Sequence, residues 1–127
     1  MSETRIVCCL SLPIDIGPMS PNRILGRHWS VRKKHKATAS RTAYVIWHNA
    51  GSPRANQPVL VTYTVRRPRK LDGDNALAAL KAVTDCLFKG RITRDDSPDF
   101  VTFNPVIQVV TPRGTAAPSV DVLVEEL

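Results

Sequence analysis

A short run of aspartates is the part of this chain best suited to chemistry. Six of its eight aspartates lie between positions 72 and 99, beginning with the sequence Asp72-Gly73-Asp74-Asn75. A second pair, Asp95-Asp96, follows about twenty residues later. Carboxylate oxygens are the hard ligands that Mg²⁺ prefers, and Mg²⁺ usually takes one or two of them and fills its shell with water and phosphate. The residue types therefore predict a divalent-metal site.

The spacing of Asp72 and Asp74 predicts that both carboxylates serve one ion. In an extended segment, residues two apart point to the same side, about 6 to 7 Å from each other. Asp96 would complete the site if the fold brings the two segments together. A metal held there would activate water and neutralise charge on a phosphate, so the predicted chemistry is phosphodiester hydrolysis.

Lys81 is the candidate for a catalytic cation. It follows Asp74 by seven residues, which is two helical turns and nearly the same helix face. An ammonium there would stabilise the charge on the attacked phosphate or position the attacking water. A structural role is the alternative, because Lys81 also precedes Asp85 by four residues and such a surface ion pair contributes about 0.5 kcal/mol.

The aspartates also have structural alternatives. Asp74 or Asn75 could serve only as the N-cap of a helix, and Asp95-Asp96 could form only a polar turn. A calcium loop is excluded, because Ala76 stands two residues after Asp74 where Asp or Asn is required. The basic run directly before the acids favours the functional interpretation, since a helix cap needs no such neighbour.

The chain ahead of the acids is almost purely basic. From Ile16 to Leu71 it has twelve Lys or Arg and no Asp or Glu, and the net charge of the whole chain is +7. A basic surface favours a polyanionic partner, and its affinity falls steeply as salt rises. A solvated face is the alternative for any single residue. The residues predicted to contact DNA are Lys33, Lys34, Arg66, Arg67, Arg69 and Lys70.

Length and composition predict one globular domain. The chain has 127 residues, enough for one hydrophobic core. No apolar run approaches the roughly 18 residues of a spanning helix, and the N-terminus has no signal-peptide pattern. The three cysteines have no metal-binding spacing. We therefore expect a cytoplasmic protein with reduced thiols and no membrane partner.

The elements expected to position these residues follow the order β-α-β-α-β-β. Strands are predicted over 5–12, 58–66, 99–110 and 119–125, and helices from about 30 to 49 and from 74 or 75 to about 88. The last two strands are expected to form a hairpin around Pro112-Arg113-Gly114. In the second helix, Leu77, Leu80, Thr84 and Leu87 would form the buried stripe. This order predicts an α+β fold, a mixed sheet with two main helices packed on it.

Four segments form an ordered set of motifs over most of the chain. They are Pro18-Met19-Ser20-Pro21-Asn22-Arg23, the run from Arg66 to Asn75, Lys81-Ala82-Val83-Thr84-Asp85-Cys86-Leu87, and Asp95-Asp96. The set resembles the RusA-type Holliday-junction resolvases of bacteria and their phages. That family has a Pro-Pro-Ser-x-Asn loop, a basic run into Asp-x-Asp-Asn, a Lys-Ala-x-x-Asp-x-Leu helix and a following Asp-Asp.

The resemblance implies a single endonuclease domain over 1–127, homodimeric and dependent on Mg²⁺, with Mn²⁺ as a substitute. It implies cleavage of four-way DNA junctions in a bacterial or phage-infected cell by paired symmetric nicks, which suits a two-fold dimer. Carried over, the metal ligands are Asp72, Asp74 and Asp96, and the catalytic lysine is Lys81. One departure concerns that lysine: the family has it four residues after the second Asp, where this chain has Ala78.

Two other functions are compatible with the same residues. One is a non-catalytic module that binds branched DNA, in which the acids only cap and end helices. The other is a metal nuclease that acts on flaps or forks. A module would bind junctions equally well without metal and would not nick them, whereas only the family resemblance distinguishes the two nucleases.

Overall fold

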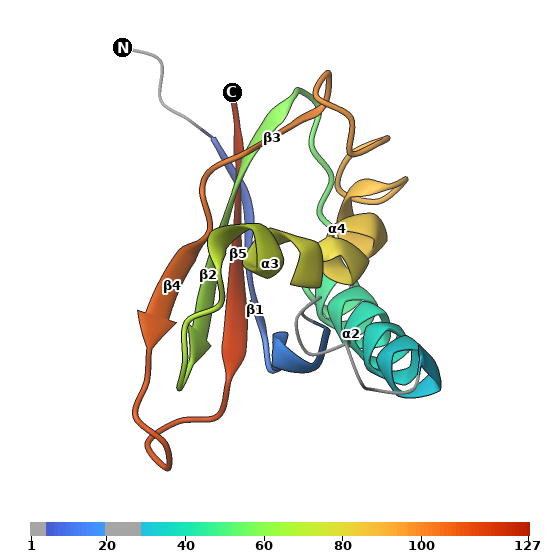
Figure 1. Cartoon of the computed structure of the whole chain (residues 1–127). Helices are drawn as coiled ribbons and strands as arrows, with labels where there is room; N and C mark the ends of the chain where they lie inside the picture. The colour runs from blue at the N-terminus through green and yellow to red at the C-terminus, as the bar shows by residue number, and fades with distance from the viewer. Residues whose placement is uncertain (1–4, 20–28) are drawn as a thin grey trace.

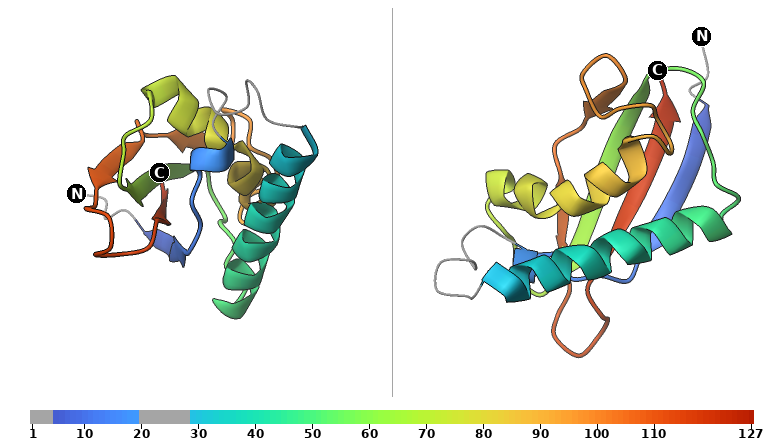
Figure 2. Two further views of the ribbon diagram at one scale, coloured as in Figure 1. Left: turned by 60° about the horizontal axis from the view of Figure 1, so that its bottom comes forward. Right: turned by 90° about the vertical axis from the view of Figure 1, so that its right-hand side faces the viewer.

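A computed structural model of the chain describes residues 5–19 and 29–127, with the side chains of residues 29–32 and 74 left out. Within this range the chain forms two layers (Figures 1 and 2). One layer is a mixed sheet of five strands, and the other contains the three α-helices, which lie on one face of that sheet. The predicted α+β class is confirmed.

The sheet is ordered around two long central strands. β5 (Ser119–Glu126) lies between β1 (Ile6–Leu12) and β2 (Val59–Arg67) and is antiparallel to both. The other edge of β2 pairs in parallel with β3 (Val101–Phe103) and β4 (Ile107–Val110). The predicted terminal hairpin is therefore wrong, because β5 pairs with the distant strands β1 and β2 instead of the strand before it.

The predicted strand over 99–110 is two short strands. Asn104, Pro105 and Val106 interrupt it, and Pro105 has no N–H with which to continue a ladder. The Asn104 amide donates to the Thr62 hydroxyl at 2.8 Å, so a side chain holds the interruption against β2. β3 consequently ends at Phe103, beside the helical layer.

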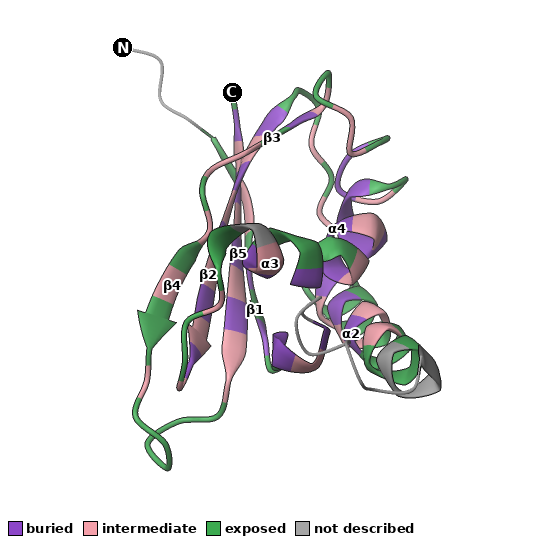
Figure 3. Ribbon diagram, viewed as in Figure 1, coloured by how far each residue is buried: buried purple, intermediate pink, exposed green. Residues whose placement is uncertain are grey.

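The core lies between the sheet and the helices. Alternate residues of β2 and β5 are buried on the helix-covered face, as the purple segments of Figure 3 show. Val61 pairs with Val124, and Tyr63 pairs with Val122, and all four are at most 1% exposed. This period of two is the reason these sequences form half-buried strands. The opposite sheet face is not covered by a described helix (Figure 2).

Helix α2 (Trp29–Asn49) confirms the first predicted helix. Ala39, Ala43 and Trp47 are buried, at successive turns of one face. The helix ends shortly before Gly51, which has φ of 95°, a left-handed conformation that favours Gly. The Trp47 indole N–H donates to the Pro53 carbonyl at 2.9 Å and fixes the exit of the chain.

The second predicted helix is broken into α3 (Gly73–Ala79) and α4 (Lys81–Phe88). At the break, the Leu80 N–H lies 3.2 Å from both the Ala76 and the Leu77 carbonyls. The predicted cap is also wrong, since Asp72 is the N-cap residue and its side chain makes no capping hydrogen bond. Gly73 and position 74 are therefore helical, and the extended geometry expected for the pair Asp72 and Asp74 is not present.

The buried stripe of α3 and α4 differs from the predicted one at its first position. Leu80, Thr84 and Leu87 are buried as predicted, and Ala76 is fully buried, whereas Leu77 is 46% exposed. α3 and α4 have more apolar residues than fit on one buried face. The small Ala76 is therefore buried, and the neighbouring Leu77 is not. Leu77 therefore remains available at the surface.

The described residues contain no helix with the length and apolarity to cross a bilayer.

Candidate functional site

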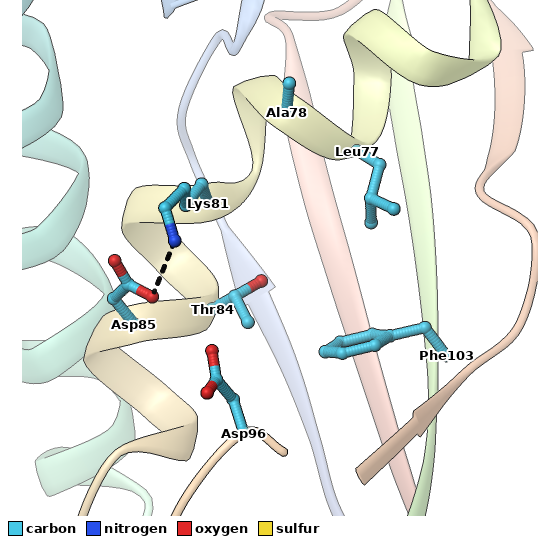
Figure 4. A pocket seen from close by; sticks show the side chains of 7 residues that line it. All are labelled: Leu77, Ala78, Lys81, Thr84, Asp85, Asp96 and Phe103. Carbon is cyan, nitrogen blue, oxygen red and sulfur yellow. Dashed lines mark ion pairs between the residues drawn. The ribbon is translucent and has the colours of Figure 1, made fainter. Parts of the chain in front are cut away.

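One pocket lies between the helices α3 and α4, the following loop and the end of β3 (Figure 4). Its volume is about 360 Å³, which is within the usual range for ligand sites. The residues that line it are Leu77, Ala78, Lys81, Thr84, Asp85, Asp96 and Phe103. The fold thus brings Lys81 and Asp96, which come from separate sequence motifs, to one space.

The pocket also shows how Lys81 is placed relative to position 78. Ala78 stands where the resembled family has its lysine, and Lys81 follows three residues later. Both positions line the same pocket in spite of the helix break at Leu80. The displaced lysine therefore still faces the space that position 78 faces.

Asp96 is held near the pocket by its own loop. The Thr93 hydroxyl lies 2.9 Å from the Phe88 carbonyl and 2.8 Å from the Asp95 carbonyl, so it ties the loop to the end of α4. The Asp96 N–H donates to the Asp95 carboxylate at 2.8 Å. These bonds hold the Asp95-Asp96 segment as a loop against the end of α4, and this loop presents the Asp96 carboxylate to the pocket (Figure 4).

Lys81 forms the surface ion pair that was its structural alternative. Its Nζ is 3.6 Å from Asp85 Oδ1, and Lys89 Nζ approaches the same oxygen at 3.3 Å. The Lys81 side chain is 65% exposed, and an exposed ion pair is weak because water screens it. The Lys81 ammonium can therefore exchange Asp85 for another anion at little cost.

The acids of the pocket create a local negative field. Asp85 and Asp96 both contribute to the raised pKa of Lys89, after its hydrogen bond to Asp85 as the first cause. The pKa of Tyr63, beneath the pocket, is raised mainly by burial and further by the same two carboxylates, while a hydrogen bond with Thr84 acts in the opposite direction. Such a field favours a cation in the pocket.

Asp72 is placed differently from Asp96. It is exposed at the start of α3, and the described lining of the pocket does not include it. Position 74 lies in the first turn of α3, and its side chain is outside the described part. The fold therefore brings Asp96 together with Asp85, an acid that the sequence did not identify as a site residue, and leaves Asp72 apart.

The donor chemistry of the pocket fits a hard divalent ion. Asp85 and Asp96 supply carboxylate oxygens to it, and Mg²⁺ commonly binds one or two carboxylates with water in its other positions. Over residues 5–19 and 29–127, excluding the side chains left out, no three His, Cys, Asp or Glu side chains gather closely enough to hold a metal. A third protein ligand would therefore have to come from a group such as Asp74.

No protein-family model and no curated protein matches this chain. Any assignment of function therefore depends on the pocket, on the surface charge and on the order of the motifs. The N-terminal motif adds little to this structural evidence, because residues 20–23 are outside the described part of the chain.

Two of the predicted DNA-binding arginines form ion pairs within the protein. Arg67 is 9% exposed, its Nε lies 3.0 Å from Asp15 Oδ1, and its Nη1 donates to the Arg69 carbonyl at 2.8 Å. Arg66 lies on the opposite sheet face and forms an ion pair with Asp121. The Arg67 guanidinium is therefore not presented to a ligand, whereas Arg66, whose side chain is 39% exposed, stays a predicted contact.

The other four predicted cations are exposed. Arg69 and Lys70 lie in the loop between β2 and α3, directly before Asp72. Lys33 and Lys34 lie in the first turns of α2. A polyanion bound near the start of α3 can therefore meet cations of the adjoining loop without disturbing the core.

Five lining residues were not predicted as site residues: Leu77, Ala78, Thr84, Asp85 and Phe103. Leu77 and Thr84 were expected in the buried stripe, and Asp85 was considered only as a partner of Lys81. The four-residue spacing of Lys81 and Asp85 indicated that these two charged groups lie on one helix face, and both line the pocket. Nothing local to Phe103 indicates that its strand ends beside α3.

Proposed function

We propose that this protein is a metal-dependent endonuclease that cuts branched DNA, with four-way junctions as its substrate. The observation that carries the proposal is the shared pocket of Lys81 and Asp96. These are two of the four residues implied by the RusA-type resemblance, and they come from different motifs. Paired symmetric cuts would be made by a homodimer, because a junction offers two equivalent strands.

The residues would divide the chemistry between them. Asp96, with a further acid such as Asp74, would hold Mg²⁺ or Mn²⁺, which would supply an activated water and charge neutralisation when bound, whereas Asp72 lies outside the lining of this pocket. Lys81 would leave Asp85, its partner at 3.6 Å, and bind a non-bridging oxygen of the attacked phosphate. Asp85 would then keep Lys89, which is 3.3 Å away, as its remaining ion-pair partner.

The charge distribution supports a DNA substrate. The chain has a net charge of +7, and the exposed cations Arg69 and Lys70 precede the first acids of the site. Contacts between such cations and phosphates provide affinity without reading sequence. Carboxylates beside a phosphate-binding surface oppose binding unless a metal is also present, and this favours an enzyme over a simple binding module.

A nicking assay tests the proposal. An end-labelled four-way junction is incubated with the protein in Mg²⁺ or in EDTA, beside a linear duplex of the same sequence. We expect metal-dependent nicks at symmetric positions on the junction only. Tight binding without nicks in either condition would contradict the enzyme and favour the binding module, whereas equal cutting of flaps or forks would assign a different branched substrate.

Asp96→Asn is the sharpest variant for this assay. It keeps the size of the side chain and removes the carboxylate, so we expect nicking to fall by at least about 100-fold while junction binding persists. The matched control is Asp99→Asn, which makes the same charge change in the same loop, at an exposed residue that lines a different pocket. Nicking by Asp96→Asn at the rate of this control would exclude Asp96 from the site.

A further inference from the structure

The pocket contains an apolar slot that hydrolysis itself does not require. The Leu77 side chain on α3 points towards the ring of Phe103 at the end of β3, which Figure 4 shows edge-on. Leu77 is 46% exposed, while Ala76 and Leu80 beside it are fully buried. Leu77 and Phe103 both line the pocket, so they form two apolar walls of one cavity.

The Phe103 wall is held rigidly from behind. Its ring stacks on Tyr63, with 6.1 Å between ring centroids and 11° between the ring planes. Phe88 meets it edge-on, at 6.2 Å and 88°. Tyr63 and Phe88 are at most 1% exposed, so the Phe103 ring presents a fixed flat surface. A fixed aromatic surface favours a planar ligand, because little side-chain entropy is lost on stacking.

The remaining side of the pocket is polar. Lys81 offers N–H donors, and Asp85 and Asp96 offer acceptor oxygens. A ligand that fits both sides has flat apolar faces and a hydrogen-bonding edge. Lys81 and Lys89, whose side chains are 65% and 48% exposed, add positive charge along α4 for an attached phosphate.

We propose that this slot binds an unpaired nucleobase of DNA, stacked between Leu77 and Phe103. The inference rests on the proposed function only in taking DNA as the ligand. A base seated there would have its own phosphate near Lys81 and Asp96. Branched DNA would then be preferred over duplex, because a paired base must first be unpaired and unstacked at a cost in free energy.

Binding measured in EDTA tests the slot separately from cleavage. A short single-stranded oligonucleotide with one central 2-aminopurine is titrated with wild-type protein, and its fluorescence is followed. We expect a change in fluorescence on binding, and about tenfold weaker binding to an oligonucleotide with an abasic residue at that position. This comparison needs no protein variant.

Leu77→Ala supplies the matching change on the protein. It should weaken binding of the intact oligonucleotide about tenfold and leave binding of the abasic one unchanged. The control is Val45→Ala on α2, which removes an apolar side chain of similar exposure, 45%, outside the lining of the pocket. Circular dichroism establishes that both variants fold.

The outcomes distinguish the slot from the nuclease. If the abasic residue and Leu77→Ala change nothing while the wild type still nicks junctions, the slot is overturned and the proposed function stands. If both weaken binding but no nicking occurs in Mg²⁺, the slot stands as a single-stranded DNA site and the nuclease is wrong. Equal weakening by Val45→Ala would also overturn the slot.

Discussion

At the scale of single residues, Asp85 has two roles: it forms ion pairs along the surface of α4, and it lines the pocket. It pairs with lysines one turn before it and one turn after it, at 3.6 and 3.3 Å. Its carboxylate also lines the pocket. Under the proposed function, Asp85 would be a positioning residue, which holds Lys81 beside the pocket until a phosphate replaces it.

Asp85→Asn should strengthen DNA binding with little effect on stability. The variant removes one negative charge from the pocket and frees two lysines, so we expect about fivefold tighter junction binding in EDTA, equivalent to about 1 kcal/mol. Both ion pairs are partly exposed, so the free energy of unfolding should change by less than about 1 kcal/mol. Fluorescence anisotropy and urea denaturation measure the two quantities.

Asp99→Asn is again the control for Asp85→Asn. It removes the same charge at an exposed residue outside this pocket. If the two variants tighten binding equally, the effect is one of net charge alone and the pocket has no special proximity to DNA.

At the scale of elements, Arg67 links the end of β2 to the segment after β1. Its guanidinium pairs with Asp15, and the Gly17 N–H donates to the same carboxylate oxygen at 3.0 Å. A Cβ on Gly17 would lie 2.2 Å from Arg67 Nη2. The lack of a side chain at Gly17 therefore allows this ion pair, which fixes how β2 leads into the basic loop and α3.

Gly17→Ala should destabilise the protein by about 1–3 kcal/mol, because the added methyl displaces a buried, paired guanidinium. Gly73→Ala is the matched control. Its Cβ would meet nothing within 4 Å, and alanine is favoured over glycine within a helix by about 0.5–1 kcal/mol. Urea denaturation should give opposite signs for the two variants, and an equal response would exclude steric conflict at Gly17.

At the scale of the whole molecule, burial makes the fold sensitive to alkaline pH. Burial, and then the neighbouring Cys9, raises the pKa of Cys8 from 9.0 to about 11. Burial also raises the pKa of Tyr63 above its ordinary value of 10.0. Between these ordinary values and the raised ones, the unfolded chain releases protons that the folded chain retains.

The free energy of unfolding should therefore be constant up to about pH 9 and fall as pH rises towards 11, since the unfolded state then binds fewer protons. Urea denaturation at pH 7.5, 9 and 10.5 measures this slope. Cys8→Ala and Tyr63→Phe each remove one titrating group and should flatten it. An unchanged slope in the double variant would show that other groups cause the alkaline loss of stability.

The sequence by itself determined most of the local elements and two of the residues that line the pocket. Sequence patterns identified the strands β2 and β5 and the helix α2, and the motifs singled out Lys81 and Asp96. These features are local, because the spacing of apolar residues along a helix or strand decides which face of that element turns towards the core.

Only the tertiary structure decided which elements meet. It placed β5 between β1 and β2, broke the second helix at Leu80 and turned Leu77 outwards towards Phe103. It also buried Arg67 against Asp15, a residue 52 positions away in the chain. Local patterns specify an apolar face but not its partner, and the partner is chosen by the packing of the whole core.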